Sequence, residues 1–170
     1  SQDFLNALFG ILLSALFIFT ALALLFAPIF ILIFAPGFYF DDQKQDLAVS
    51  LLRIMFPYLA LISLVAFAAG IQNSHDKFSI PAITPLIFNL CLIVSAWLIA
   101  PNVEIPVIAL AWGVLLAGVL QLIFQLAPLA AIKKIPLPKV NLNNPGVKKF
   151  FILILPALIA GGIAQINLLV

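Results

Sequence analysis

Five apolar runs, each long enough to cross a bilayer, dominate this chain of 170 residues. A membrane-spanning helix needs roughly 20 consecutive apolar residues, and the runs cover residues 4–35, 47–71, 78–100, 105–132 and 150–170. The chain is 65% hydrophobic and 8% charged, whereas a soluble domain carries about 25% charged residues. These proportions indicate an integral membrane protein.

The runs are rich in Phe and lack the period-two alternation of barrel strands, which favours helices. We therefore predict an all-α membrane protein, a polytopic bundle with five spans. The first run is too long for one straight span. Its helix should end or kink near Pro28, which has no N–H to donate to the carbonyl of Leu24. Pro36 and Gly37 then predict a true stop.

Lysines in the connections predict the topology. The segments expected on one side of the membrane, which include residues 72–77 and 133–149, carry six lysines, and those on the other side carry only Lys44. The positive-inside rule makes the lysine-rich side the cytoplasm. The loop 133–149 is interpreted as a solvated loop that fixes topology. Its lysines also suit anionic lipid headgroups, and the two interpretations are compatible.

The most informative stretch is 70–89, a short polar break followed by an apolar segment with two prolines. Pro81, Pro85 and Asn89 recur at helical spacing on one face, and Asn89 falls near the middle of its span. Asn89 either hydrogen-bonds a carbonyl that the prolines leave free, or it lines a cavity.

Three further polar side chains inside the runs are candidate cavity or substrate residues. Arg53 lies near the non-cytoplasmic end of the second run, where it either snorkels to the interface or faces a cavity that receives an anion. Gln121 and Gln125 are four residues apart on one helix face. They either make interhelical hydrogen bonds or line a cavity.

Prolines and glycines within the runs are candidate hinges or structural breaks, because they weaken the helical ladder and allow bending. The candidates are Pro57, Pro81, Pro85, Pro156, Gly161 and Gly162.

The sequence offers no support for catalysis. No carboxylate lies inside a run, the only His is His75, and no nucleophile–base pair or metal-ligand spacing is present. The single Cys91 cannot form a disulfide within the chain. We predict no enzyme activity, cofactor or catalytic residue, and the net charge of +2 suggests no nucleic-acid partner.

One segment of the chain resembles a known family. Residues 53–90, RIMFPYLALISLVAFAAGIQNSHDKFSIPAITPLIFNL, resemble the most characteristic stretch of the MurJ (MviN) family. These are lipid II flippases of the multidrug/oligosaccharidyl-lipid/polysaccharide exporter superfamily. APGF at 35–38, ALAW at 109–112 and GVLQLIFQLAPL at 118–129 follow the same resemblance in order and spacing.

The resemblance implies a fragment that covers about the third to seventh transmembrane helices. Residues 1–132 would be part of the N-terminal lobe with four spans, 133–149 the cytoplasmic basic loop, and 150–170 the truncated first helix of the second lobe. A start at Ser1 and an end inside an apolar run also predict a fragment. The family's central arginines lie outside this window.

The implied function is movement of lipid II, the undecaprenyl-pyrophosphate-linked peptidoglycan precursor, from the inner to the outer leaflet of the bacterial inner membrane by alternating access. Lipid II, membrane lipids and proteins of cell-wall synthesis are the expected partners. One alternative is another lipid-linked oligosaccharide flippase or drug exporter of the superfamily, which the FPYL and NS-x3-FSIPA-x2-P pattern disfavours. The other is a non-transporting scaffold, which the intramembrane Pro, Gly and polar residues disfavour.

Overall fold

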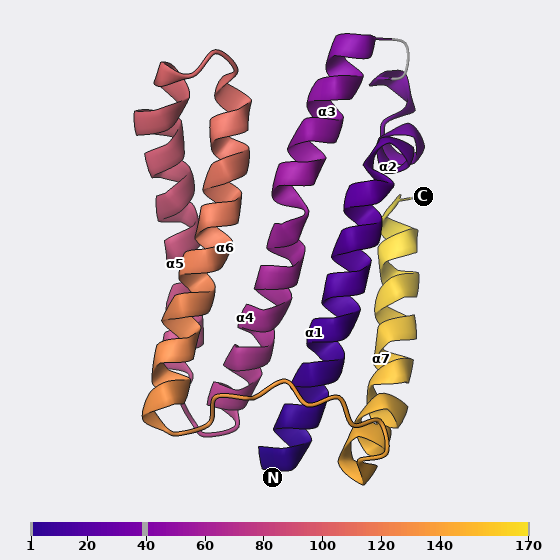
Figure 1. Ribbon diagram of the computed structural model, residues 1–170, viewed down its shortest axis with the longest axis vertical. Coiled ribbons are helices and arrows are strands. Elements are labelled where there is room, and N and C mark those ends of the chain that lie inside the picture. The colour runs from indigo at the N-terminus through magenta and orange to yellow at the C-terminus, as the bar shows by residue number, and fades with distance from the viewer. Residues whose placement is uncertain (1, 39–40, 170) are drawn as a thin grey trace. The chain divides into compact units, whose positions relative to one another are not determined.

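Every secondary-structure element in the described residues is helical (Figure 1). The computed structural model describes residues 2–38 and 41–169, apart from the side chains of residues 157, 162 and 164–169. The chain divides into two compact units, residues 15–135 and residues 1–14 with 136–170. The helix α1 (Gln2–Leu25) contributes to both units.

In the unit 15–135, the central element is α6 (Pro106–Ala131), which packs against α3 (Asp42–Met55), α4 (Pro57–Asn73) and α5 (Ser79–Val94). Small residues make this close packing feasible. They form a buried stripe along α6 that comprises Ala109, Ala111, Gly113, Ala117 and Gly118.

Two glycines of α6 mark the closest approaches. A Cβ at Gly113 would lie 2.7 Å from the Cβ of Ser95, and one at Gly118 would lie 2.8 Å from the ring of Tyr58. A side chain at either position would therefore force the neighbouring helices apart.

Prolines set the breaks within the first two apolar runs. The helix α1 ends at Leu25 and α2 (Ala27–Phe34) follows it with Pro28 in its first turn. This confirms the break expected from the missing N–H of Pro28. In the second run, Pro57 begins α4 directly after the junction residue Phe56, where it removes a donor that the first turn does not need.

The third run changes helix type towards its end. The helix α5 continues into one π-helical turn, η2 (Ser95–Ile99), and a short 3-10 turn, η3 (Ala100–Asn102). A second short 3-10 turn, η1 (Pro36–Phe38), follows α2 at the expected Pro36–Gly37 stop. At the start of α3, the side chain of Asp41 accepts a hydrogen bond from the backbone N–H of Lys44, at 3.2 Å.

In the unit formed by 1–14 and 136–170, the loop after residue 135 is anchored to the start of α1. Asn6 accepts hydrogen bonds from two backbone N–H groups, from Leu137 at its side-chain oxygen (2.9 Å) and from Lys139 at its carbonyl (3.2 Å). A Cβ at Gly10 would lie 2.7 Å from backbone atoms of Lys139. This part of the basic loop is therefore held by backbone contacts, and α7 (Pro145–Leu169) follows it.

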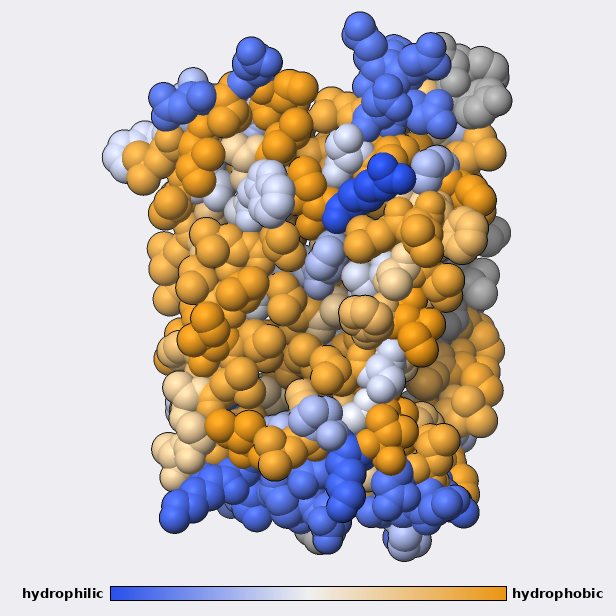
Figure 2. Space-filling model, viewed as in Figure 1, coloured by the Kyte–Doolittle hydropathy of each residue, from blue (hydrophilic) through white to orange (hydrophobic). Residues whose placement is uncertain are grey.

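Within the described residues, four helical segments are long and apolar enough to cross a membrane, namely Gln2–Leu25, Asp42–Asn73, Ser79–Asn102 and Pro106–Ala131. Hydrophobic residues cover their middles, and hydrophilic residues gather at their ends (Figure 2). A polytopic helical bundle agrees with the expected fold class, while the expected count of five spans is not confirmed.

Candidate functional site

Four buried polar side chains connect the helices α4, α5 and α6 inside the membrane-spanning unit. They are Gln72 at the end of α4, Thr84 on α5, and Gln121 and Gln125 on α6, and we call them the amide cluster. All four are at most 5% exposed. Buried polar groups in hydrocarbon need partners, and each helix supplies them for the others.

Gln125 lies at the centre of the amide cluster. Its Nε2 donates to the hydroxyl of Thr84 at 2.6 Å. Gln72 Nε2 donates both to the backbone carbonyl of Gln125, at 3.0 Å, and to Gln125 Oε1. Gln121 Nε2 donates to the carbonyl of Thr84 at 3.0 Å. Each hydrogen bond between membrane helices is worth about 1 kcal/mol, so the cluster favours one fixed arrangement of the three helices.

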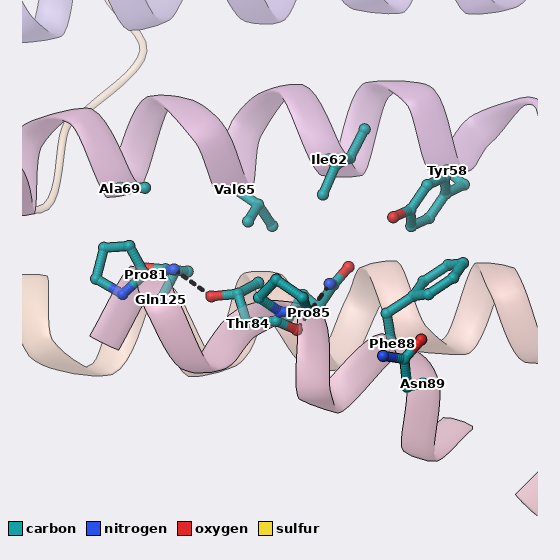
Figure 3. A pocket seen from close by; sticks show the side chains of 11 residues that line it. Tyr58, Ile62, Val65, Ala69, Pro81, Thr84, Pro85, Phe88, Asn89 and Gln125 are labelled. Atoms are coloured by element: carbon teal, nitrogen blue, oxygen red, sulfur yellow. Dashed lines mark hydrogen bonds between the residues drawn. The ribbon is translucent and has the colours of Figure 1, made fainter. Parts of the chain in front are cut away.

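Three members of the amide cluster, Thr84, Gln121 and Gln125, line a groove between α4 and α5. The groove has a volume of about 280 Å³ and is lined mainly by apolar residues of both helices, with Gln121 and Gln125 from α6. Tyr58 and Phe88 face each other across it, with ring centroids 5.5 Å apart, and Pro81 lies opposite Ala69 (Figure 3).

Asn89 and the two prolines of α5 also line this groove. Pro81 lies in the first turn of α5 and Pro85 lies in its interior. Unlike the glutamines, Asn89 is exposed in the described structure. The structure thus brings Asn89, Gln121 and Gln125 to one groove, and it places Arg53 elsewhere.

Arg53 lies in the last turn of α3, where its side chain reaches the end of α1. Its side chain is exposed, and its Nε donates to the carbonyl of Leu24 at 3.3 Å. This is the carbonyl that lacks its helical donor because Pro28 has no N–H. Rings of Phe19 and Phe30 contact Phe56 beside this contact. Arg53 therefore satisfies a backbone group that α1 itself leaves open.

The described part of the chain contains no cluster of three or more His, Cys, Asp or Glu side chains that could hold a metal ion. The ring nitrogen Nδ1 of His75 lies 2.9 Å from the carbonyl of Ile71, and the thiol of Cys91 is buried. The groove thus offers neutral hydrogen-bonding groups and apolar surface.

Comparison with known proteins decides the family. The family model described as "Lipid II flippase MurJ" matches residues 1–170. The chain belongs to the MurJ family. It is 36% identical over 174 residues to the lipid II flippase MurJ of Burkholderia cenocepacia, covering 100% of this chain and 34% of the relative.

Other MurJ relatives give the same result. A probable lipid II flippase MurJ of Vibrio cholerae is 42% identical over 126 residues, covering 74% of this chain and 24% of the relative. One of Rickettsia prowazekii is 36% identical over 173 residues, covering 100% and 33%. The chain therefore spans between a quarter and a third of the length of these relatives. It is part of a multi-pass bacterial membrane protein, and its family is described as one of flippases, which are transport proteins.

The remaining hinge candidates of this MurJ chain differ in their surroundings. Pro156 lies inside α7, and a Cβ at Gly161 would meet no atom within 4 Å. Gly162 lies in the same helix, but its surroundings are outside the described residues. Pro156 and Gly161 therefore stay candidates for a bend in α7.

Two members of the amide cluster, Gln72 and Thr84, are not predicted as site residues from the sequence. Gln72 is counted there among the polar residues of the turn 72–77, yet it lies in α4 and is fully buried. Thr84 lies between Pro81 and Pro85, and a single hydroxyl in an apolar run does not by itself indicate a buried hydrogen bond. Helical spacing could have found Gln72, since it extends the face of Ala68 and Val65, which are buried as well.

Proposed function

We propose that the full-length protein moves lipid II from the inner to the outer leaflet of the bacterial inner membrane. The observation that carries this proposal is the family match along all 170 residues. A charged, sugar-bearing headgroup cannot cross hydrocarbon unaided, because burying its polar groups without partners costs several kcal/mol each. The protein has to provide a polar path while the lipid tail stays in the bilayer.

In this proposal, residues 1–132 belong to the N-terminal lobe, and 150–170 form the first helix of the second lobe and a fifth span. Alternating access moves such lobes as rigid bodies around the substrate. The amide cluster supports rigidity in the N-terminal lobe, since it ties α4, α5 and α6 together at one level. Pro156 and Gly161 support bending in α7.

Lysine counts support the orientation. Residues 72–77 and 133–149 would face the cytoplasm, and 41–46 and 102–104 the opposite side. A Cys at Asn143 in the full-length protein should react with a membrane-impermeant thiol reagent only after the membrane is opened. Labelling of intact cells at this position would overturn the orientation.

Complementation tests the function. The full-length protein should support growth of a strain depleted of its own lipid II flippase, and it should restore lipid II in the outer leaflet, measured by its accessibility to an added hydrolase. The membrane level of the protein has to be quantified in parallel. Failure to restore outer-leaflet lipid II at a normal membrane level would refute the proposal.

A further inference from the structure

The loop that precedes α7 exposes long apolar side chains next to lysine. Leu137, Val140 and Leu142 are 65%, 63% and 62% exposed, and Lys139, which lies among them in the sequence, is exposed as well. Water is a poor surrounding for three such apolar side chains. Apolar side chains interspersed with Lys are instead the composition of segments that lie in the membrane interface, where the apolar part is buried and the ammonium stays among the headgroups.

Anchoring to α1 fixes the depth of this loop. Asn6 accepts hydrogen bonds from the backbone N–H groups of Leu137 and Lys139, and the backbone of Lys139 lies against Gly10. The helix α1 has 24 residues, with its one charged residue, Asp3, in the first turn. It is about 36 Å long, whereas the hydrocarbon layer is about 30 Å thick, so its first turns lie at the headgroup boundary. The loop bound to these turns is held at the same boundary.

The charge of the unit that contains this loop favours an anionic partner. Within residues 1–14 and 136–170, only the carboxylate of Asp3 balances Lys139, Lys148 and Lys149. All three lysines are exposed, and none forms an ion pair with a described carboxylate. Lys148 and Lys149 also lie at the start of α7, whose first turn has no acidic residue, so the helix dipole adds to their positive potential. Anionic headgroups attract such lysines cumulatively.

We propose that residues 137–149 dock on the membrane surface as an interfacial loop. Its exposed apolar side chains enter the headgroup boundary, and its three lysines bind the phosphates of anionic phospholipids. Because this loop leads directly into α7, docking holds the start of α7 at the membrane surface. The docking itself does not depend on transport, whereas its assignment to the cytoplasmic leaflet rests on the orientation proposed above.

Spin-label accessibility in the full-length protein tests the docking. A nitroxide is attached to Val140→Cys in a cysteine-free background, and the control label is attached to Asn102→Cys, at an exposed position in a connection without lysine. The vesicles contain phosphatidylcholine alone, or phosphatidylcholine and phosphatidylglycerol in equal parts. Both leaflets have the same composition, so the result does not depend on how the protein is oriented.

Two relaxation agents report the depth of each label, since oxygen concentrates in hydrocarbon and a nickel chelate stays in water. In anionic vesicles, the label at Val140 should be accessible to oxygen and shielded from the nickel chelate, and it should be less shielded in phosphatidylcholine alone. The label at Asn102 should give the same values in both lipids.

Charge variants test the role of the lysines. Lys139→Gln/Lys148→Gln/Lys149→Gln should lower the ratio of docked to undocked loop in anionic vesicles by about fivefold for each lysine removed. High salt should have the same effect on the unmodified loop. Lys44→Gln makes the same chemical change on α3, outside this loop, and should leave the label at Val140 shielded.

Apolar variants test insertion. Leu137→Asn/Leu142→Asn keeps the size of both side chains but makes them polar, and it should raise nickel accessibility at Val140 in both lipid compositions. Leu137→Ile/Leu142→Ile is the matched control, because it stays apolar and should remain docked.

Several results would overturn the interfacial loop. They are nickel accessibility at Val140 as high as at Asn102 in anionic vesicles, equal values at Val140 in the two lipids, or an unchanged value in the triple Lys variant. Shielding of the Val140 label from both oxygen and the nickel chelate would overturn it as well, and would mean that another part of the protein covers the loop. None of these results bears on lipid II transport, which complementation tests separately.

Discussion

Two regions of the molecule are held together by different chemical groups. Polar side chains connect the bundle of α4, α5 and α6, and backbone groups make the contacts in the unit of residues 1–14 and 136–170. In the bundle, side-chain amides and a hydroxyl connect the helices. In the unit of the loop and α1, Asn6 binds backbone N–H groups, and Gly10 lets backbone lie against backbone. Hydrocarbon offers polar side chains no partner, so they bond to each other and to backbone carbonyls of neighbouring helices. An irregular loop, in contrast, must first satisfy its own backbone.

Gly10→Ala should have the largest effect on this comparison. Its Cβ would lie 2.7 Å from backbone atoms of Lys139, and backbone cannot move aside as a side chain does. We expect a destabilisation of up to about 3 kcal/mol and faster trypsin cleavage after Lys139 in the full-length protein. Gly70→Ala is the control, since a Cβ there meets no atom within 4 Å. Equal cleavage rates in the two variants would show that the loop is not anchored at Gly10.

Gln125→Leu should be the most damaging change within the amide cluster. It removes the donor to Thr84 and the side-chain acceptor of Gln72, at an expected cost of about 1–2 kcal/mol in the free energy of unfolding. The double variant Gln72→Leu/Gln125→Leu should regain part of this loss, because the buried Gln72 amide, which loses its side-chain acceptor in the single variant, is then removed as well. If the losses of the two single variants simply add in the double variant, the pair is not coupled.

Arg53→Ala should cost less, about 1 kcal/mol, because the side chain is exposed and makes one hydrogen bond to Leu24. Pro28→Ala would return a helical N–H to that carbonyl. The loss from Arg53→Ala should therefore shrink in a Pro28→Ala background, measured as a double-mutant cycle.

Complementation by Arg53→Ala distinguishes this structural role from substrate contact. We expect Arg53→Lys and Arg53→Ala to support growth of a flippase-depleted strain whenever their membrane levels are normal. A well-inserted Arg53→Ala protein that fails to complement would instead indicate that the guanidinium binds the substrate.

The smallest effect is expected at Asp41, at the start of α3. Lys44 lies 2.8 Å from its carboxylate, and the hydrogen bonds from Lys44 lower the pKa of Asp41 from its ordinary value of 3.8. A lowered pKa contributes stability above pH 3.8 that is lost as the pH falls through the shifted value. Hydrogen exchange in the first turn of α3 should speed up below that pH. Asp41→Asn should weaken this pH dependence, and an unchanged profile would argue against the ion pair.

Hydropathy and proline positions were sufficient to predict much of the bundle. The helix break at Pro28 and the stop at Pro36 lie where the missing N–H groups predict them. Long apolar runs are reliable because bilayer thickness sets their length.

The partners of the polar residues could not be predicted in the same way. Gln72 extends the buried helical face of Val65 and Ala68, but only the packing of α4 on α6 reveals that Gln125 is its partner. The contact between Arg53 and Leu24 joins residues 29 positions apart in the sequence. Helical periodicity indicates which face a residue occupies, but it does not indicate which helix lies opposite.

The π-helical turn at Ser95–Ile99 has a consequence for how this span faces its surroundings. A π turn holds one residue more than an α turn, so it shifts the phase of every later residue around the helix axis. A helical wheel drawn through 79–102 without this shift assigns the end of the span to the wrong side. Trp97, which is 76% exposed, lies within the shifted turn. Its direction therefore depends on a local change of pitch as well as on the apolar pattern before it.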